Sequence, residues 1–218
     1  MDADEGKILA WTEAERLSVA DLLEGLDEKD WSAGTLCPKW TVHELAAHLA
    51  LSPRTGLKDT ILGALKAKGN WDRMTADQAI GHATRFSPAE LVAQIRKDAG
   101  SDRRSPGAKQ IDSLADVLIH GQDIVRPLGR TRPMPEEPAI ASLEHILASP
   151  FWGARKRCKG VKMIATDADW TGGEGPGEVR GPLADLLMAA TGRGAGLAAL
   201  TGSGKAQIGA HCNPPISV

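Results

Sequence analysis

The stretch at residues 111–126, IDSLADVLIHGQDIVR, carries the clearest pattern in this sequence of 218 residues. Its apolar residues recur every three or four positions, which is the period of an amphipathic helix. Pro127 and Gly129 follow it as stop signals. The apolar side consists of Leu114, Val117, Leu118, Ile124 and Val125, and the opposite side carries Asp112, Asp116, His120 and Asp123. We therefore expect a helix with one core face and one face of acids and a histidine.

Helix-start signals divide the sequence before this stretch. Three segments, beginning at Thr12, Thr41 and Ser87, place Ser or Thr three residues before Glu. This is the pattern of a capping box, in which each of the two side chains accepts a hydrogen bond from a backbone N–H. Residues 53–68 also show helical periodicity, and residues 136–147 are expected to form the last helix. We predict a helical bundle over residues 1–148.

The pattern changes after residue 130, where prolines mark a connector. Residues 160–165 (GVKMIA) and 178–180 predict strands, and residues 182–190 predict a helix. Residues 206–210 are expected to form a last strand. The predicted fold class is α+β, with the helical bundle followed by a small mixed α/β domain over residues 149–218.

Composition restricts the class of function. Lys and Arg number 26 and Asp and Glu number 28, so the net charge is −2, which disfavours a nucleic-acid partner. No apolar run approaches the roughly 20 residues of a membrane span, and the N-terminus lacks the apolar region of a signal peptide. We expect a cytoplasmic monomer or homodimer with no membrane partner.

The three cysteines form no CxxC pair and are odd in number, which excludes a disulfide framework. We expect Cys37, Cys158 and Cys212 to be small apolar fillers or inert thiols. Cys37 is the least certain of the three, because it precedes a helix start, where a thiolate can be favoured. The sequence contains no tyrosine, so no phenol can serve as an acid, a base or a ligand.

Three side chains form a candidate metal site. Asp116 and His120 are four residues apart on the predicted helix, so they project from nearly the same side. His48, at the edge of the apolar face of its own helix, can supply a third ligand. Two histidines and one carboxylate leave an open coordination position, which is typical of a catalytic metal. The alternative is an ordinary solvated helix face, and spacing alone favours that alternative.

Short motifs recur in a characteristic order along nearly the whole chain. The first part carries Trp31, residues 37–42 (CPKWTV), His48 and residues 116–124 (DVLIHGQDI). The second part carries Asp169, Trp170, Gly175, residues 179–182 (VRGP) and residues 191–193 (TGR). Together they resemble the mycothiol-dependent maleylpyruvate isomerase family, which belongs to the DinB-like superfamily of metal-binding four-helix bundles.

The resemblance implies roles for individual residues. It implies that His48, Asp116 and His120 ligate a divalent metal, usually zinc, or another such as nickel. The family usually has Glu where Asp116 stands. Asp123 is implied to be a catalytic acid near the site that contacts a ligand or the thiol. Arg193 is implied to hold a carboxylate of the substrate or of the thiol, and the alternative for Arg193 is an arginine that complements a helix C-terminus.

The implied activity uses an external low-molecular-weight thiol, mycothiol. A metal with an open position lowers the pKa of such a thiol, and the thiolate adds to an electrophilic small-molecule substrate, in isomerisation or in transfer. The alternative is a stress-related, non-enzymatic metal- or thiol-binding protein of the same superfamily. Asp116 in place of Glu is the feature that most favours this alternative.

Overall fold

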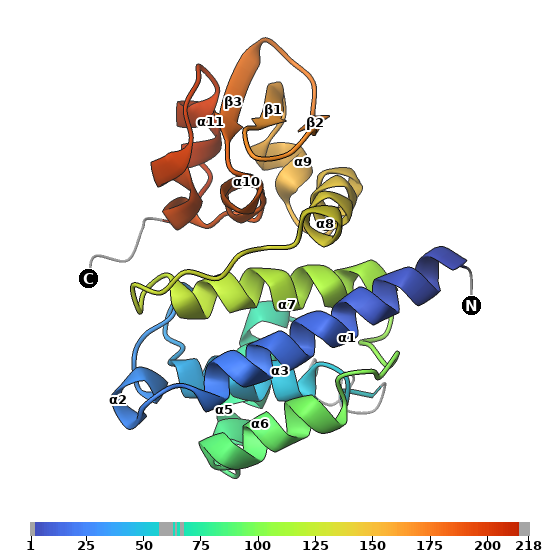
Figure 1. The fold of residues 1–218 in the computed structure, drawn as a ribbon, viewed down its shortest axis with the longest axis vertical. Helices are drawn as coiled ribbons and strands as arrows, with labels where there is room; N and C mark the ends of the chain where they lie inside the picture. The colour runs from blue at the N-terminus through green and yellow to red at the C-terminus, as the bar shows by residue number, and fades with distance from the viewer. Residues whose placement is uncertain (1–2, 57–62, 64, 66–67, 214–218) are drawn as a thin grey trace. The chain divides into compact units, whose positions relative to one another are not determined.

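The computed structural model describes residues 3–56, 63, 65 and 68–213 (Figure 1). The chain separates into two compact units, Met1–Gly129 and Arg130–Val218. This division differs from the expected one after residue 148, because helix α8 (Glu136–Ala148) packs against helix α10 (Leu183–Ala190) of the second unit. The amphipathic pattern of α8 shows that it needs a partner surface, but it does not show which surface that is.

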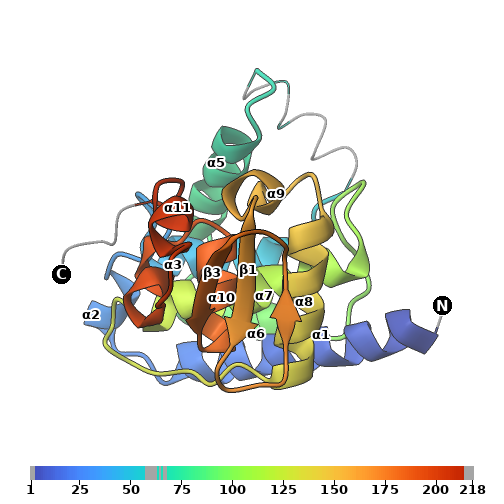
Figure 2. The same ribbon diagram turned by 90° about the horizontal axis from the view of Figure 1, so that it is seen from above.

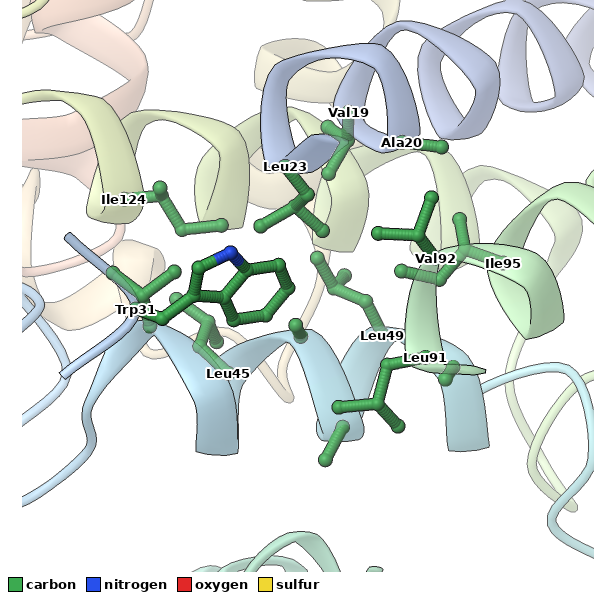
Figure 3. Close-up of a cluster of buried hydrophobic side chains, with 14 of the residues drawn as sticks. Val19, Ala20, Leu23, Trp31, Leu45, Leu49, Leu91, Val92, Ile95 and Ile124 are labelled. Atoms are coloured by element: carbon green, nitrogen blue, oxygen red, sulfur yellow. The ribbon is translucent and has the colours of Figure 1, made fainter. Parts of the chain in front are cut away.

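The first unit is a helical bundle, as predicted. Its core is formed mainly by α1, α3, α6 and α7, and Figure 1 shows α1 and α7 side by side. The Trp31 side chain lies between these helices, among Leu23, Leu45 and Ile124 (Figure 3). The helices of this unit are α1 (Ala3–Glu24), α2 (Glu28–Trp31), α3 (Val42–Leu51), α5 (Trp71–Ala83), α6 (Pro88–Lys97) and α7 (Gln110–Val125).

Two of the three predicted capping boxes are confirmed. The backbone N–H of Thr41 donates to Glu44 (2.7 Å), and Ser87 makes the same bond with Glu90 (2.8 Å). The box expected at Thr12 is wrong, because α1 already begins at Ala3. The Thr12 hydroxyl donates instead to the carbonyl of Ile8 (2.8 Å), a bond that a threonine inside a helix can make.

The helix expected over residues 53–68 is described only in part. Residues 53 and 54 form a turn, residues 55 and 56 have no regular structure, and residues 63 and 65 are helical. Apart from residue 68, which lies in a turn, the other positions fall outside the described residues. Among the described residues, no helix is long and apolar enough to span a lipid bilayer.

The second unit contains a three-stranded sheet in the order β2-β1-β3, which Figure 2 shows from above. β1 pairs in parallel with β3 and antiparallel with β2. The strands expected at 160–165 and 178–180 and the helix expected at 182–190 are confirmed. The elements are α8, α9 (Ala154–Arg157), β1 (Val161–Ala165), β2 (Thr171–Gly172), β3 (Gly177–Gly181), α10, the 3-10 helix η1 (Gly194–Ala199) and α11 (Lys205–Gly209).

The strand expected at residues 206–210 is wrong, because α11 occupies this segment. The chain meets the sheet edge earlier, where Arg180 and Thr201 exchange two backbone hydrogen bonds of 2.9 Å. The backbone N–H of Gly204 still donates to the carbonyl of Glu178 in β3 (2.9 Å), and α11 begins at the next residue with Ile208 as its one buried residue. One buried apolar residue fits a short helix as well as it fits a strand, so the sequence pattern did not distinguish them.

Candidate metal centre

Helix α7 carries three of the predicted site residues, and it is buried on nearly all sides between α1 and α3. The exposed fractions of the side chains are 24% for Asp116, 12% for His120 and 0% for Asp123. These values exclude an ordinary solvated face, the alternative that spacing alone favours. The polar stripe of α7 therefore lies inside the bundle, where charged groups need partners.

His48 reaches this stripe from α3. The capping box of Thr41 and Glu44 fixes the start of α3, and His48 follows in its last turn with its side chain 17% exposed. The His48 and His120 rings meet edge-on with their centroids 5.0 Å apart. Nε2 of His48 lies 3.4 Å from Oδ1 of Asp116, and Nε2 of His120 lies 3.3 Å from the same oxygen. The structure thus brings together the three residues that the sequence grouped.

These distances suit a shared metal ion. A charge-assisted N–H···O bond is normally about 2.7–2.9 Å long, shorter than both contacts to Asp116. By contrast, tetrahedral nitrogen and oxygen ligands that lie about 2.0–2.1 Å from zinc are about 3.3 Å apart. One nitrogen or oxygen atom of each of the three residues lies within 4.8 Å of those of the other two. The residues present therefore fit a divalent cation.

The charges of the cluster also favour a cation. Burial would raise the pKa of Asp116, but the His48 and His120 rings outweigh it and hold that pKa well below its usual range. Burial disfavours charge on His120, but the Cys37 sulfur, Asp116 and Asp123 together raise its pKa well above its usual value. Asp116 is therefore a carboxylate at neutral pH. The site attracts positive charge, either as a proton on an imidazole or as a metal ion that replaces it.

The other nitrogen of His120 faces Asp123. Nδ1 of His120 donates to Oδ2 of Asp123 at 2.9 Å, which is an ordinary hydrogen-bond length. A histidine that binds a metal through one ring nitrogen commonly donates from the other to a carboxylate, and this bond fixes the tautomer. Asp123 lies in this arrangement, completely buried and in contact with a proposed ligand.

Two further side chains at the site were not predicted as site residues. The Cys37 sulfur lies 3.3 Å from Oδ2 of Asp123 and 3.7 Å from Nδ1 of His120, and the Trp40 ring lies 5.3 Å from the His48 ring. Both residues come from the loop before α3. The sequence signal available for Cys37 was its position just before a helix start. Cys158 differs, because burial raises its pKa to about 11 and keeps it a neutral thiol at pH 7.

The comparisons with known proteins agree with this architecture. Residues 12–110 match the family model of the mycothiol maleylpyruvate isomerase N-terminal domain. This segment is similar to that domain family and covers a little under half of the chain. The matched segment includes Cys37 and His48 and ends before Asp116.

Two solved structures resemble the whole chain. One is the crystal structure of the mycothiol-dependent maleylpyruvate isomerase, with 17% identity and a TM-score of 0.61. The other is a point mutant of that isomerase, with 16% identity and a TM-score of 0.61. Each likeness covers 91% of this chain and 92% of the other, and at these identities it shows a shared fold. No curated protein matches the sequence.

Arg193 lies in the second unit, shortly after the end of α10. Its Nη1 donates to the carbonyl of Thr191 (3.3 Å), the residue that caps the C-terminus of α10. Its backbone N–H donates to the carbonyl of Met188 (2.9 Å). These contacts match the helix-terminus alternative for Arg193. Its role in binding a carboxylate stays a prediction.

Proposed function

We propose that the chain is a metal-dependent enzyme that uses a low-molecular-weight thiol of the mycothiol type to isomerise an electrophilic small molecule. The observation that carries the proposal is the cluster of His48, Asp116 and His120, with separations of 3.3–3.4 Å. The match of residues 12–110 to the mycothiol maleylpyruvate isomerase N-terminal domain supports the thiol and the reaction class. Zinc is the proposed metal, because two histidines and one carboxylate form a typical catalytic zinc site.

The site residues have different roles in this proposal. His48, Asp116 and His120 hold the ion, and Asp123 holds the His120 ring with Nε2 directed at Asp116. A divalent metal held by these residues would lower the pKa of a bound thiol, so that the thiolate could add to a conjugated cis double bond; rotation about the resulting single bond and elimination of the same thiolate would give the trans isomer. Because Asp123 is fully buried, it acts through His120 and does not itself touch the substrate.

We assign Arg193 to a substrate or thiol carboxylate. A guanidinium binds a carboxylate through two parallel hydrogen bonds, and its planar fork loses little freedom in doing so. The contact between Arg193 and Thr191 engages Nη1, and the backbone bond to Met188 holds the start of the side chain. Maleylpyruvate carries carboxylates and a conjugated double bond, so it is the first substrate to test.

The test combines metal analysis with turnover. Purified wild-type protein is expected to carry stoichiometric zinc, and His120→Ala is expected to lose it. His211→Ala removes an exposed histidine of the second unit and is expected to keep the metal. Turnover of maleylpyruvate should require added mycothiol and should fail in His120→Ala. A wild-type protein that binds no divalent metal when zinc is supplied would overturn the metal site, and metal binding without turnover would indicate a non-enzymatic binder.

A further inference from the structure

A hydrogen-bonded chain leads from Cys37 to the proposed metal ligand His120. The Cys37 sulfur contacts Oδ2 of Asp123 (3.3 Å), and the same oxygen accepts the Nδ1–H bond of His120 (2.9 Å). The carboxylate between them has an exposed fraction of 0%. A buried carboxylate oxygen needs donors, and here the thiol and the imidazole both supply one.

The loop before α3 is built to hold this thiol in place. The backbone N–H of Leu36 donates to the carbonyl of Asp123 (3.1 Å), so the loop docks on the same residue that the thiol contacts. The N–H of Cys37 donates to the hydroxyl of Thr35 (3.2 Å), and the Cys37 carbonyl accepts from Trp40 (3.1 Å). Cys37 is thus fixed by its own backbone on both sides, as a precise contact requires.

The distances separate this group from the metal cluster. His120 and Asp123 are at hydrogen-bond length, whereas the contacts of Asp116 are longer than a charge-assisted bond and match the spacing of metal ligands. In the contact between Cys37 and Asp123, the Sγ–H group donates to Oδ2 of the carboxylate at 3.3 Å.

We propose that Cys37 is a positioning residue, which acts through Asp123 to hold His120 in the orientation that the metal needs. The proposal rests on the proposed function. It gives Cys37 a role that neither the sequence motifs nor the comparisons assign to it. The thiol holds Oδ2 of Asp123 in place beside His120, and the hydrogen bond from Nδ1 of His120 to this oxygen then orients Nε2 toward Asp116. A role in coordinating the metal directly is the competing assignment, and the experiment separates the two.

Three variants test the proposal. Cys37→Ala removes the donor and is expected to lower zinc affinity about threefold to tenfold, less than the roughly 10–100-fold typical of removing a direct partner of a ligand. Cys37→Ser keeps a hydroxyl donor and is expected to restore most of that affinity. The control is Cys212→Ser in the second unit, whose thiol contacts backbone carbonyls, and it is expected to match wild type.

The deciding readout is the exchange of the His120 Nδ1 proton with solvent, measured by nuclear magnetic resonance of ¹⁵N-labelled protein. Exchange is expected to be slow in wild type and Cys37→Ser and faster in Cys37→Ala. The measurement is made on metal-free protein, so it tests Cys37 even if the proposed metal function fails. Equal exchange rates in wild type and Cys37→Ala would overturn the proposal.

Cobalt substitution provides the second arm. The cobalt-loaded wild-type protein is expected to show no thiolate-to-cobalt charge-transfer band in the near ultraviolet. A band that appears in wild type and disappears in Cys37→Ser would make Cys37 a direct ligand and would overturn the positioning role.

Discussion

Zinc is expected to stabilise the protein against heat, and His48→Ala is expected to abolish this stabilisation. His48 supplies one of three proposed ligands, 3.4 Å from Asp116. At a free zinc concentration of 100 times the dissociation constant, binding contributes about 2.7 kcal/mol. For a chain of this size each kcal/mol raises the melting temperature by about 2–4 °C, so the wild-type shift should be about 5–10 °C. Differential scanning calorimetry with and without zinc measures it.

His43→Ala is the matched control, because it removes a histidine from the same helix. Its Nε2 lies 3.0 Å from the carbonyl of Phe86, and its ring meets Trp31 edge-on. Five residues separate it from His48, which corresponds to about 140° around the helix. His43→Ala should lower the melting temperature of the metal-free protein, since it loses a hydrogen bond of about 1 kcal/mol, yet keep the full zinc shift. A zinc shift that survives in His48→Ala would refute the assignment of His48 as a ligand.

Three other predictions concern separate features. Lys39 has a φ of 70°, a left-handed conformation that favours glycine. Lys39→Gly should therefore raise the free energy of unfolding in urea by about 0.5–1 kcal/mol. A free energy of unfolding below that of wild type would contradict backbone strain at Lys39. Burial lowers the pKa of His82 despite its hydrogen bond to Gln94 (2.8 Å). The unfolded chain therefore takes up a proton on His82 at a higher pH than the folded chain does, and the free energy of unfolding falls as the pH drops below about 6.5. The free energy of unfolding in urea should differ less between pH 5 and pH 8 in His82→Gln than in wild type. An equal difference in the two proteins would exclude His82 as the cause. Asp116→Asn should weaken zinc binding by more than about 100-fold in a chelator competition, because it removes the only anionic ligand of the cluster.

The parts of the fold that the sequence predicts well depend on local chemistry. The capping boxes at Thr41 and Ser87 work through atoms three residues apart, so the sequence contains all that they need. The capping box expected at Thr12 is wrong because the Thr-x-x-Glu pattern there lies inside helix α1, which begins upstream at Ala3. The placement of α8 depends on which surface its apolar face meets, and that is a tertiary choice.

The candidate site divides in the same way. Asp116 and His120 share a side of α7 because four residues make about one turn, so their pairing could be predicted. The contact of Cys37 could not, since it depends on how the loop before α3 docks on Asp123. The solvated-face alternative fails for a related reason. A stripe of acids and a histidine looks the same in the sequence whether it faces water or a neighbouring helix.

Asp116 in place of Glu favours a non-enzymatic protein only if the shorter side chain fails to reach the other ligands. In the structure its Oδ1 lies 3.4 Å from Nε2 of His48 and 3.3 Å from Nε2 of His120. Both separations equal the roughly 3.3 Å expected between tetrahedral zinc ligands, so one oxygen already stands at ligand distance from both rings. A longer side chain from the same backbone would have to fold back to occupy this position. The shorter acid therefore suits the spacing between α3 and α7 in this chain, and it gives no reason to expect a site unable to hold a catalytic metal.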